Sequence, residues 1–253
     1  MGSLHEGHIK LIEKCSMKCD GTIVSIFVNP TQFTNKTDLV NYPQSIKKDI
    51  QIIKKINNNA IIYTPLVSDL YSFPIKSEVF NLDGIDEIIE GEYRKGHFQG
   101  VATVVNKLFK KFSPDYAFFG EKDYQQILVI EKLIKKYDLK VKIKSVLTVR
   151  EENGLAMSSR NFLLDKKTRY DARIIYESLR MAKRMIKTND ISEIKFYIGE
   201  IFLMNKKFDL EYFYIAENHS LKEVKSFNSK LKLRAFICVK AKGVRLIDNI
   251  ALF

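Results

Sequence analysis

Residues 1–28 read MGSLHEGHIKLIEKCSMKCDGTIVSIFV and contain a histidine motif, a helix-period run and an apolar run. His5 and His8 stand three residues apart, just before the helix-period run Ile9–Cys19. This spacing predicts that both imidazoles lie on one face of the helix's first turn. A helix start favours an anion through its unpaired N–H groups and its dipole. The apolar run Thr22–Val28 predicts a strand buried on both faces. The stretch therefore predicts an α/β unit that binds an anion such as a triphosphate.

The alternation of helical and strand-like segments continues to about residue 147. Helices are expected at 45–56, 101–112 and 124–137, and strands at 60–63, 115–119 and 142–147. Such alternation predicts parallel βαβ units in a doubly wound, Rossmann-like parallel sheet. Ligands of such sheets bind at the carboxyl ends of the strands. The loops expected there are 29–33, 120–123 and the stretch after Val149, and all three carry polar side chains.

The order of elements changes after about Asn161. Helices are expected at 166–187 and 191–205, followed by strands at 210–216, 232–240 and 244–248. Consecutive helices followed by consecutive strands predict a separate α+β domain. We therefore expect a nucleotide-binding, Rossmann-like domain at 1–150 and a small C-terminal α+β domain at 151–253.

The composition is that of a globular protein, with 45% hydrophobic and 28% charged residues. No apolar run is long enough for a membrane helix, and no signal-peptide pattern opens the chain. The three cysteines are unpatterned, which fits a reducing compartment, so a cytoplasmic protein is expected. The net charge of +12 comes from lysines spread along the whole chain. This distribution favours a solvated basic surface and small anionic substrates over a nucleic acid.

Six segments, in one order along nearly the whole chain, resemble the pantothenate synthetase family. They are MGSLHEGH at 1–8, VSIFVNPTQF at 24–33, GHFQGVATVVNKLF at 96–109, PDYAFFGEKDYQQ at 114–126, TVREENGLAMSSRN at 148–161 and RLIDN at 245–249. The resemblance implies an amide-forming ligase that makes pantothenate from pantoate, β-alanine and ATP through a pantoyl-adenylate intermediate, with release of AMP and pyrophosphate. It also implies the H-x-G-H nucleotidylyltransferase type of fold.

The residues themselves suit this chemistry. His5 and His8 can donate hydrogen bonds to phosphate oxygens, and His8 is the expected general acid because an unperturbed imidazole titrates near neutral pH. The alternative interpretation is that the two histidines are zinc ligands or ordinary surface residues. Lys122 can meet ATP phosphates, and Arg160 can clamp them, although the loop at 157–160 could instead be a polar helix cap. The resemblance implies catalytic roles for His5, His8 and Lys122 and ATP contacts from Met1, Gly2, Ser3, Leu4, His5, Glu6, Gly7, His8, Gly120, Glu121, Lys122, Asp123, Val149, Met157, Ser158, Ser159 and Arg160.

Two glutamines are the expected organic-acid ligands. An amide both donates and accepts, which suits the carboxylate and hydroxyls of a hydroxy acid, and it adds no competing nucleophile. The resemblance implies that Gln32 and Gln126 bind pantoate and that Gln32 also binds β-alanine. ATP is expected as its magnesium complex without a dedicated protein metal site, and no organic cofactor is expected. A homodimer is implied by the family.

The chain departs from the family pattern in four places, one of which is an acidic pair reduced to Thr37-Asp38. Lys95 replaces a proline before Gly96, and Gln44 replaces an arginine after Pro43. Family members also carry a further strand and helix ahead of the residues that match Met1 onward. That strand is expected to be central in the sheet. Without it we expect unpaired strand edges and a groove in the core of the first domain, and we expect the recorded start to be too late or the gene to be truncated.

Two other functions remain open from the sequence alone. One is a nucleotidylyltransferase that makes a dinucleotide-like product, against which Gln32, Gln126 and the small C-terminal domain argue. The other is an inactive or RNA-binding relative of this fold, which the +12 charge favours and the retention of every central motif opposes. Pyrophosphate release that requires pantoate would separate the ligase from both.

Overall fold

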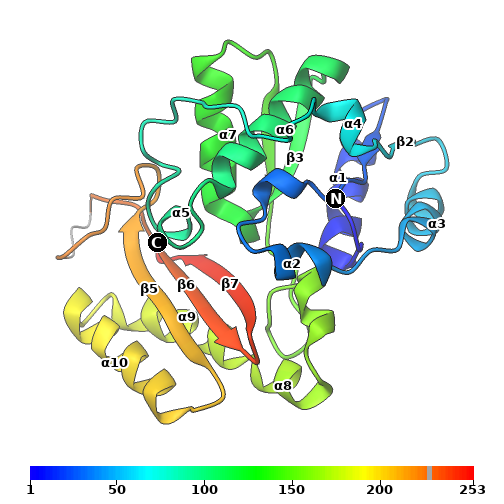
Figure 1. The fold of residues 1–253 in the computed structure, drawn as a ribbon. Coiled ribbons are helices and arrows are strands. Elements are labelled where there is room, and N and C mark those ends of the chain that lie inside the picture. Colours follow the sequence, from blue (N-terminus) through cyan, green and yellow to red (C-terminus); the bar gives the residue numbers. More distant parts are fainter. Residues whose placement is uncertain (227–229) are drawn as a thin grey trace. The chain divides into compact units, whose positions relative to one another are not determined.

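The computed structural model describes residues 1–226 and 230–253. The chain divides into two compact units, Met1–Leu147 (unit 1) and Thr148–Phe253 (unit 2), which run from blue to green and from green to red in Figure 1. Within the described ranges, no helix combines the length and apolarity that a bilayer crossing requires. Each unit has hydrophobic cores of its own.

Unit 1 alternates helices and strands, which confirms the predicted α/β class. Its elements are α1 (Glu6–Lys18), β1 (Ile23–Ser25), η1 (Pro30–Gln32), α2 (Lys36–Val40), α3 (Ile46–Ile56), β2 (Ile61–Tyr63), α4 (Val67–Leu70), α5 (Glu90–Tyr93), α6 (His97–Phe112), β3 (Tyr116–Gly120), η2 (Glu121–Asp123), α7 (Tyr124–Lys136) and β4 (Lys142–Val146). The short helices α2, α4 and α5 have no counterpart in the prediction, because four or five residues are too few to show a helical period.

The strands of unit 1 form two parallel pairs. β1 pairs with β2, with Val24 opposite Ile62, and β3 pairs with β4, with Phe118 opposite Lys144. Each pair has its own apolar cluster. The β1–β2 cluster contains Leu4, Ile12, Val24, Ile26, Ile53 and Ala60, and the β3–β4 cluster contains Leu70, Tyr71, Val101, Val104, Val105, Phe109, Ile130 and Val141. The predicted sheet is therefore present as two halves.

A cavity of about 820 Å³ is lined by β1 and β3 together with α1 and α6. Its lining includes all three residues of β1 and all five of β3. At one end, the Met1 amino group donates to the Ser25 carbonyl at 2.7 Å and the Phe27 N–H donates to the Met1 carbonyl at 2.8 Å, so Met1 continues a parallel ladder beside β1. The predicted burial of 22–28 on both faces is wrong for Ile23, which lines the cavity and is 40% exposed.

Unit 2 has consecutive helices and then an antiparallel sheet, as predicted. Its elements are η3 (Ser159–Leu163), α8 (Lys166–Asp171), α9 (Ile174–Met185), α10 (Ile191–Met204), β5 (Asp209–Glu217), β6 (Leu233–Ala241) and β7 (Val244–Ala251), with strand order β5-β6-β7. The single helix predicted at 166–187 is wrong. The chain turns between α8 and α9, where the Arg173 N–H reaches the Tyr170 carbonyl and the Ile175 N–H reaches the Ala172 carbonyl in tight i→i−3 bonds.

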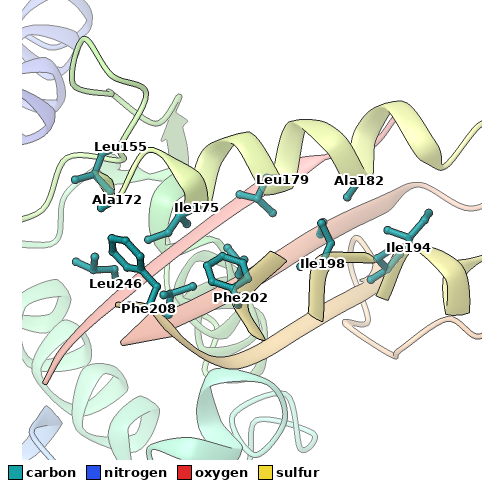
Figure 2. Close-up of a cluster of buried hydrophobic side chains, with 14 of the residues drawn as sticks. Leu155, Ala172, Ile175, Leu179, Ala182, Ile194, Ile198, Phe202, Phe208 and Leu246 are labelled. Atoms are coloured by element: carbon teal, nitrogen blue, oxygen red, sulfur yellow. The ribbon is translucent and has the colours of Figure 1, made fainter. Parts of the chain in front are cut away.

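One continuous cluster fills the space between the helices and the sheet of unit 2. Figure 2 shows Ile175 and Leu179 of α9 gathered with Ile198 and Phe202 of α10. The middle strand β6 is buried along nearly its whole length. Phe208, just ahead of β5, is 1% exposed and is among the largest fully buried side chains. Among the described residues of unit 2, one continuous cluster therefore joins the helices to the sheet.

Candidate active site

The two N-terminal histidines lie together at the start of α1. Their ring centroids are 4.0 Å apart. His5 is the residue that caps α1 and does not belong to the first turn, which corrects the predicted placement. Its Nδ1 accepts from the Gly7 N–H at 3.1 Å, while the His5 N–H donates to His8 Nδ1 at 3.4 Å. Since both Nδ1 atoms accept, each neutral ring carries its proton on Nε2. Both rings are thus fixed as Nε2–H donors.

This cap also changes the expected anion cradle. The Gly7 N–H is taken by His5 Nδ1, and the His8 N–H donates to the His5 carbonyl at 2.8 Å. Two of the helix's N-terminal donors are therefore already bonded within the chain. The imidazoles, rather than these backbone groups, are the donors that suit a phosphate.

Asp49 of α3 holds the histidine segment in place, a role the sequence analysis did not anticipate. Its side chain is 2% exposed, and its two oxygens accept from the Ser3 and Leu4 N–H groups at 2.8 Å each. Ser3 has φ of 53°, in the left-handed region. The available signal was the spacing of Asp49 four residues before Ile53, which puts a carboxylate on the buried face of a helix.

Burial is the largest influence on His8 and lowers its pKa well below the usual value for histidine. The neighbouring His5, the amino terminus and Lys122 lower this pKa further. His8 is therefore a neutral imidazole at pH 7 in the protein without bound anions. An imidazolium acid would need the field of a bound polyphosphate to raise this pKa.

The β3–α7 junction carries the second group of predicted residues. β3 ends at Gly120, and η2 places Lys122 with its Nζ 3.5 Å from Asp123 Oδ1. Gln126 lies in the first turn of α7. Its neighbour Gln125 is buried, and its side chain bonds backbone groups: it accepts from the N–H of residue 90 and donates to the carbonyls of residues 85 and 88. The two adjacent glutamines thus differ, since Gln126 lines the cavity and Gln125 fixes the chain.

The cavity lining brings together predicted residues from three parts of the sequence. They are Met1, Gly2, His8, Gln32, Gly120, Asp123 and Gln126. Gln32 ends the turn η1, and its Oε1 lies 3.4 Å from Asn29 Nδ2. The cavity lining does not include Ser3, Leu4, His5, Glu6, Gly7, Glu121 or Lys122 among the residues that the structure describes. Lys122 is nevertheless near enough to act on the pKa of His8.

The remaining predicted residues form a compact loop in unit 2. The Val149 carbonyl accepts from the Met157 N–H at 2.9 Å. Ser158 caps η3 by accepting from the Arg160 N–H at 3.2 Å, and Ser159 is 3% exposed. The helix-cap interpretation of Ser158 is therefore correct as a local description. It fixes the backbone of residues 157–160 within this unit.

A zinc site at the histidines is not supported. Both Nδ1 atoms accept backbone N–H groups. In the parts of the chain that the structure describes, no three His, Cys, Asp or Glu side chains cluster as metal ligands. The paired histidines are better placed to meet an anion than a cation.

A parallel α/β unit with paired histidines at a helix start and a Gly-Glu-Lys-Asp turn after a strand defines an ATP-using enzyme of the nucleotidylyltransferase fold type. The family model described as Pantoate-beta-alanine ligase matches residues 1–251. The chain belongs to this family. It is therefore an ATP-dependent ligase that joins pantoate and β-alanine through an amide bond.

Relatives and solved structures agree with this assignment. The chain is 44% identical over 252 residues to a pantothenate synthetase of Christiangramia forsetii, covering 100% of this chain and 89% of the relative. A pantothenate synthetase structure from Thermus thermophilus superimposes with a TM-score of 0.93 at 32% identity, covering 100% and 91%. A pantoate-β-alanine ligase from Francisella tularensis, complexed with β-γ ATP and β-alanine, gives 0.75 at 32% identity, covering 100% and 87%.

Proposed function

We propose that the cavity end of unit 1 activates pantoate as an adenylate before the amide forms. A carboxylate oxygen of pantoate attacks the α-phosphorus of ATP, and pyrophosphate leaves. The amine of β-alanine then attacks the acyl carbon, and AMP leaves with the electron pair of the broken acyl–oxygen bond. The observation that carries this proposal is the convergence of His8, Gln32, Asp123 and Gln126 on one cavity.

His5 and His8 donate from Nε2–H to ATP phosphate oxygens. Negative charge grows on the bridging oxygen and on pyrophosphate as the α–β bond breaks, so oriented donors stabilise the transition state more than the ground state. Lys122 adds a positive charge beside His8. The expected role of His8 as general acid then depends on bound ATP, whose negative charge raises the pKa that burial lowers.

Gln32 and Gln126 bind pantoate, and Gln32 also contacts β-alanine. Their amides match a carboxylate and hydroxyl groups without adding charge. Both amides are neutral, so they can hydrogen-bond pantoate without forming an ion pair with its carboxylate. The carboxylate then stays available as the nucleophile. This division assigns the acid substrate to the glutamines and the triphosphate to the histidines and Lys122.

The other ATP contacts come from Ser3, Leu4, Glu6, Gly7, Glu121 and the unit 2 residues Val149, Met157, Ser158, Ser159 and Arg160. Arg160 supplies a charge-assisted contact to a phosphate. ATP enters as its magnesium complex, in which the metal keeps waters and few protein ligands. Residues 1–150 form the nucleotide-binding domain in this scheme, and residues 151–253 form the small domain. A cytoplasmic homodimer is the proposed form of the enzyme.

Pantoate-dependent exchange of labelled pyrophosphate into ATP, measured without β-alanine, tests the two-step order. Exchange is expected with pantoate alone. His8→Ala and Lys122→Ala should each lower it about 100-fold or more, as for a lost transition-state donor. Gln126→Ala should mainly raise the KM for pantoate and leave the KM for ATP near its normal value.

Exposed residues of the same types provide controls. His219→Ala and Lys140→Ala replace side chains at the surface of unit 2 and unit 1, and both should keep full exchange. Exchange that appears only after β-alanine is added would contradict the adenylate step. Equal small effects of the His8, Lys122 and Gln126 changes would contradict the assigned residues.

A further inference from the structure

The backbone of Gln32 is held by two side chains from the loop that precedes α6 and from its first turn. His97 Nδ1 lies 2.7 Å from the Gln32 carbonyl oxygen, and Arg94 Nη2 donates to the same oxygen at 3.3 Å. A carbonyl oxygen only accepts, so the proton of neutral His97 sits on Nδ1. His97 Nε2 is then the acceptor for Arg94 Nη1, 3.2 Å away. The two side chains form one connected clamp on Gln32.

The clamp is buried and has a fixed charge state. Arg94 Nη1 lies 3.3 Å from Glu90 Oε1, and the two side chains are only 13% and 7% exposed. His97 is 8% exposed, and burial together with the Arg94 guanidinium lowers its pKa to about 3. His97 therefore keeps one tautomer at any working pH. The Arg94 charge is balanced by Glu90 rather than by a substrate.

A close backbone approach at Gly100 also holds the same loop against α6. A Cβ on Gly100 would lie 2.3 Å from the Thr31 carbonyl oxygen and 2.7 Å from the Gln32 backbone nitrogen, so only glycine fits. The Gly100 carbonyl accepts from Asn29 Nδ2 at 3.0 Å, and Asn29 Oδ1 accepts from the Tyr71 hydroxyl at 2.7 Å. The turn that carries Gln32 is thereby fixed at both ends.

Neither Arg94, His97 nor Gly100 is among the described residues that line the cavity, whereas Gln32 and Asn29 are. We propose that Arg94, His97 and Gly100 are positioning residues, which aim the Gln32 amide at the acid substrates by fixing the backbone beneath it. This proposal rests on the proposed role of Gln32 in binding pantoate and β-alanine. Displacing a positioned group by about 1 Å can cost about 100-fold in rate, so a loosened turn is expected to be costly.

Steady-state kinetics of His97→Ala test the proposal. The variant is expected to lower kcat/KM for pantoate about 10- to 100-fold and to leave the KM for ATP within about twofold. His97→Asn retains an N–H donor at the position of Nδ1, and it should recover most of the loss. A KM for ATP that rises in step with that for pantoate, or no rescue by asparagine, would overturn the positioning role.

A double-mutant cycle separates this proposal from the role of Gln32 itself. Gln32→Ala alone should lower kcat/KM for pantoate, and His97→Ala should add little in the Gln32→Ala background, since both changes remove the same contact. An unchanged kcat/KM in Gln32→Ala would refute the proposed function of Gln32. A full, additive loss from His97→Ala in that background would refute the positioning role while leaving Gln32 in place.

Gly100→Ala tests the positioning of Gln32 independently of His97. It should reproduce the pantoate defect of His97→Ala, because the added methyl group must push the Thr31–Gln32 backbone away. Gly199→Ala is the matched control, since a Cβ there meets no atom within 4 Å in the helix α10. Normal pantoate kinetics in a folded Gly100→Ala protein would overturn the role of the close approach.

Discussion

The two units handle their apolar residues differently. Unit 2 places two helices on one three-stranded sheet and fills the space between them with a single cluster. Unit 1 has two apolar clusters, one for each parallel strand pair, and a cavity of about 820 Å³ lined by both β1 and β3. Part of the candidate site of unit 1, including His8, Gln32 and Gln126, lines that cavity. Unit 1 therefore keeps open space beside its two strand pairs, whereas the described helices and strands of unit 2 pack together around one cluster.

The same contrast extends to buried titratable groups. Unit 1 holds His8 and His97, whose pKa values burial lowers. The histidine of unit 2, His219, lies exposed at the surface. The stability of unit 1 is therefore expected to depend on pH through these two buried histidines.

The largest expected change in the stability of unit 1 relative to unit 2 comes from filling the cavity. Adding about five strand-forming residues ahead of Met1 would extend its parallel ladder along β1, toward the cavity. Each backbone hydrogen bond gained contributes about 1 kcal/mol net, so a gain of roughly 3 kcal/mol in the free energy of unfolding is expected. Amide hydrogen exchange should show slower exchange in β1 and β3 and no change in β6.

An extension of the same length made of Gly and Ser is the control for this change. Gly and Ser form strands poorly, and Gly loses more conformational freedom than any other residue when the backbone is ordered, so this extension should not add a stable strand and should leave exchange in β1 and β3 as it was. Equal protection from both extensions, or from neither, would contradict the cavity as a strand-accepting site.

Acidification should destabilise unit 1 through His97. The folded-state pKa of about 3 lies below the usual histidine value, so its contribution to stability is complete above about pH 6.5 and is lost as pH falls toward 3. The loss is about 1.4 kcal/mol per pH unit, or about 2 kcal/mol between pH 7 and pH 5. Urea unfolding at pH 7 and pH 5 measures this loss. Between the two pH values, the free energy of unfolding should fall by about 2 kcal/mol less in His97→Asn than in the unaltered protein.

His219→Asn is the matched change in unit 2. Its free energy of unfolding should depend on pH as steeply as that of the unaltered protein. A His97→Asn protein whose unfolding free energy falls with acid as steeply as before would show that another group carries the effect.

The smallest expected effect is the difference in stability cost between two valine-to-alanine substitutions, one in each unit. Val239 of β6 is 0% exposed within the unit 2 core, while Val105 of α6 is 8% exposed and lines the cavity. Val239→Ala should lower the free energy of unfolding by about 2 kcal/mol, as for two methyl groups lost from a packed site. Val105→Ala should cost about 1 kcal/mol or less, because one side of that residue already borders open space. Equal losses in urea unfolding would show that the cavity wall is as tightly packed as the unit 2 core.

Periodicity predicted most of the elements because burial repeats at the helix or strand period over their length. α3, predicted at 45–56, spans Ile46–Ile56, and β4, predicted at 142–147, spans Lys142–Val146. The failures are local. The helix predicted at 166–187 is divided between α8 and α9 by tight backbone bonds that leave no mark on the hydrophobic pattern. Ile23 was expected to be buried but is 40% exposed beside the cavity, because a run of apolar residues does not show which faces of a strand are covered by other elements.

The sequence by itself determined the α/β class, the order of the elements and the identity of the family, because these follow from residue spacing and from motifs that are contiguous in the chain. Only the tertiary structure decided how His8, Gln32 and Gln126 meet at one cavity and which histidine tautomers face it. It also decided the burial of Asp49 and the clamp of Arg94 and His97 on Gln32. These features join residues far apart in the sequence, such as His97 and Gln32, which are 65 positions apart, and His8 and Gln126, which are farther apart still. They depend on hydrogen-bond direction and desolvation, which arise only when distant segments pack together.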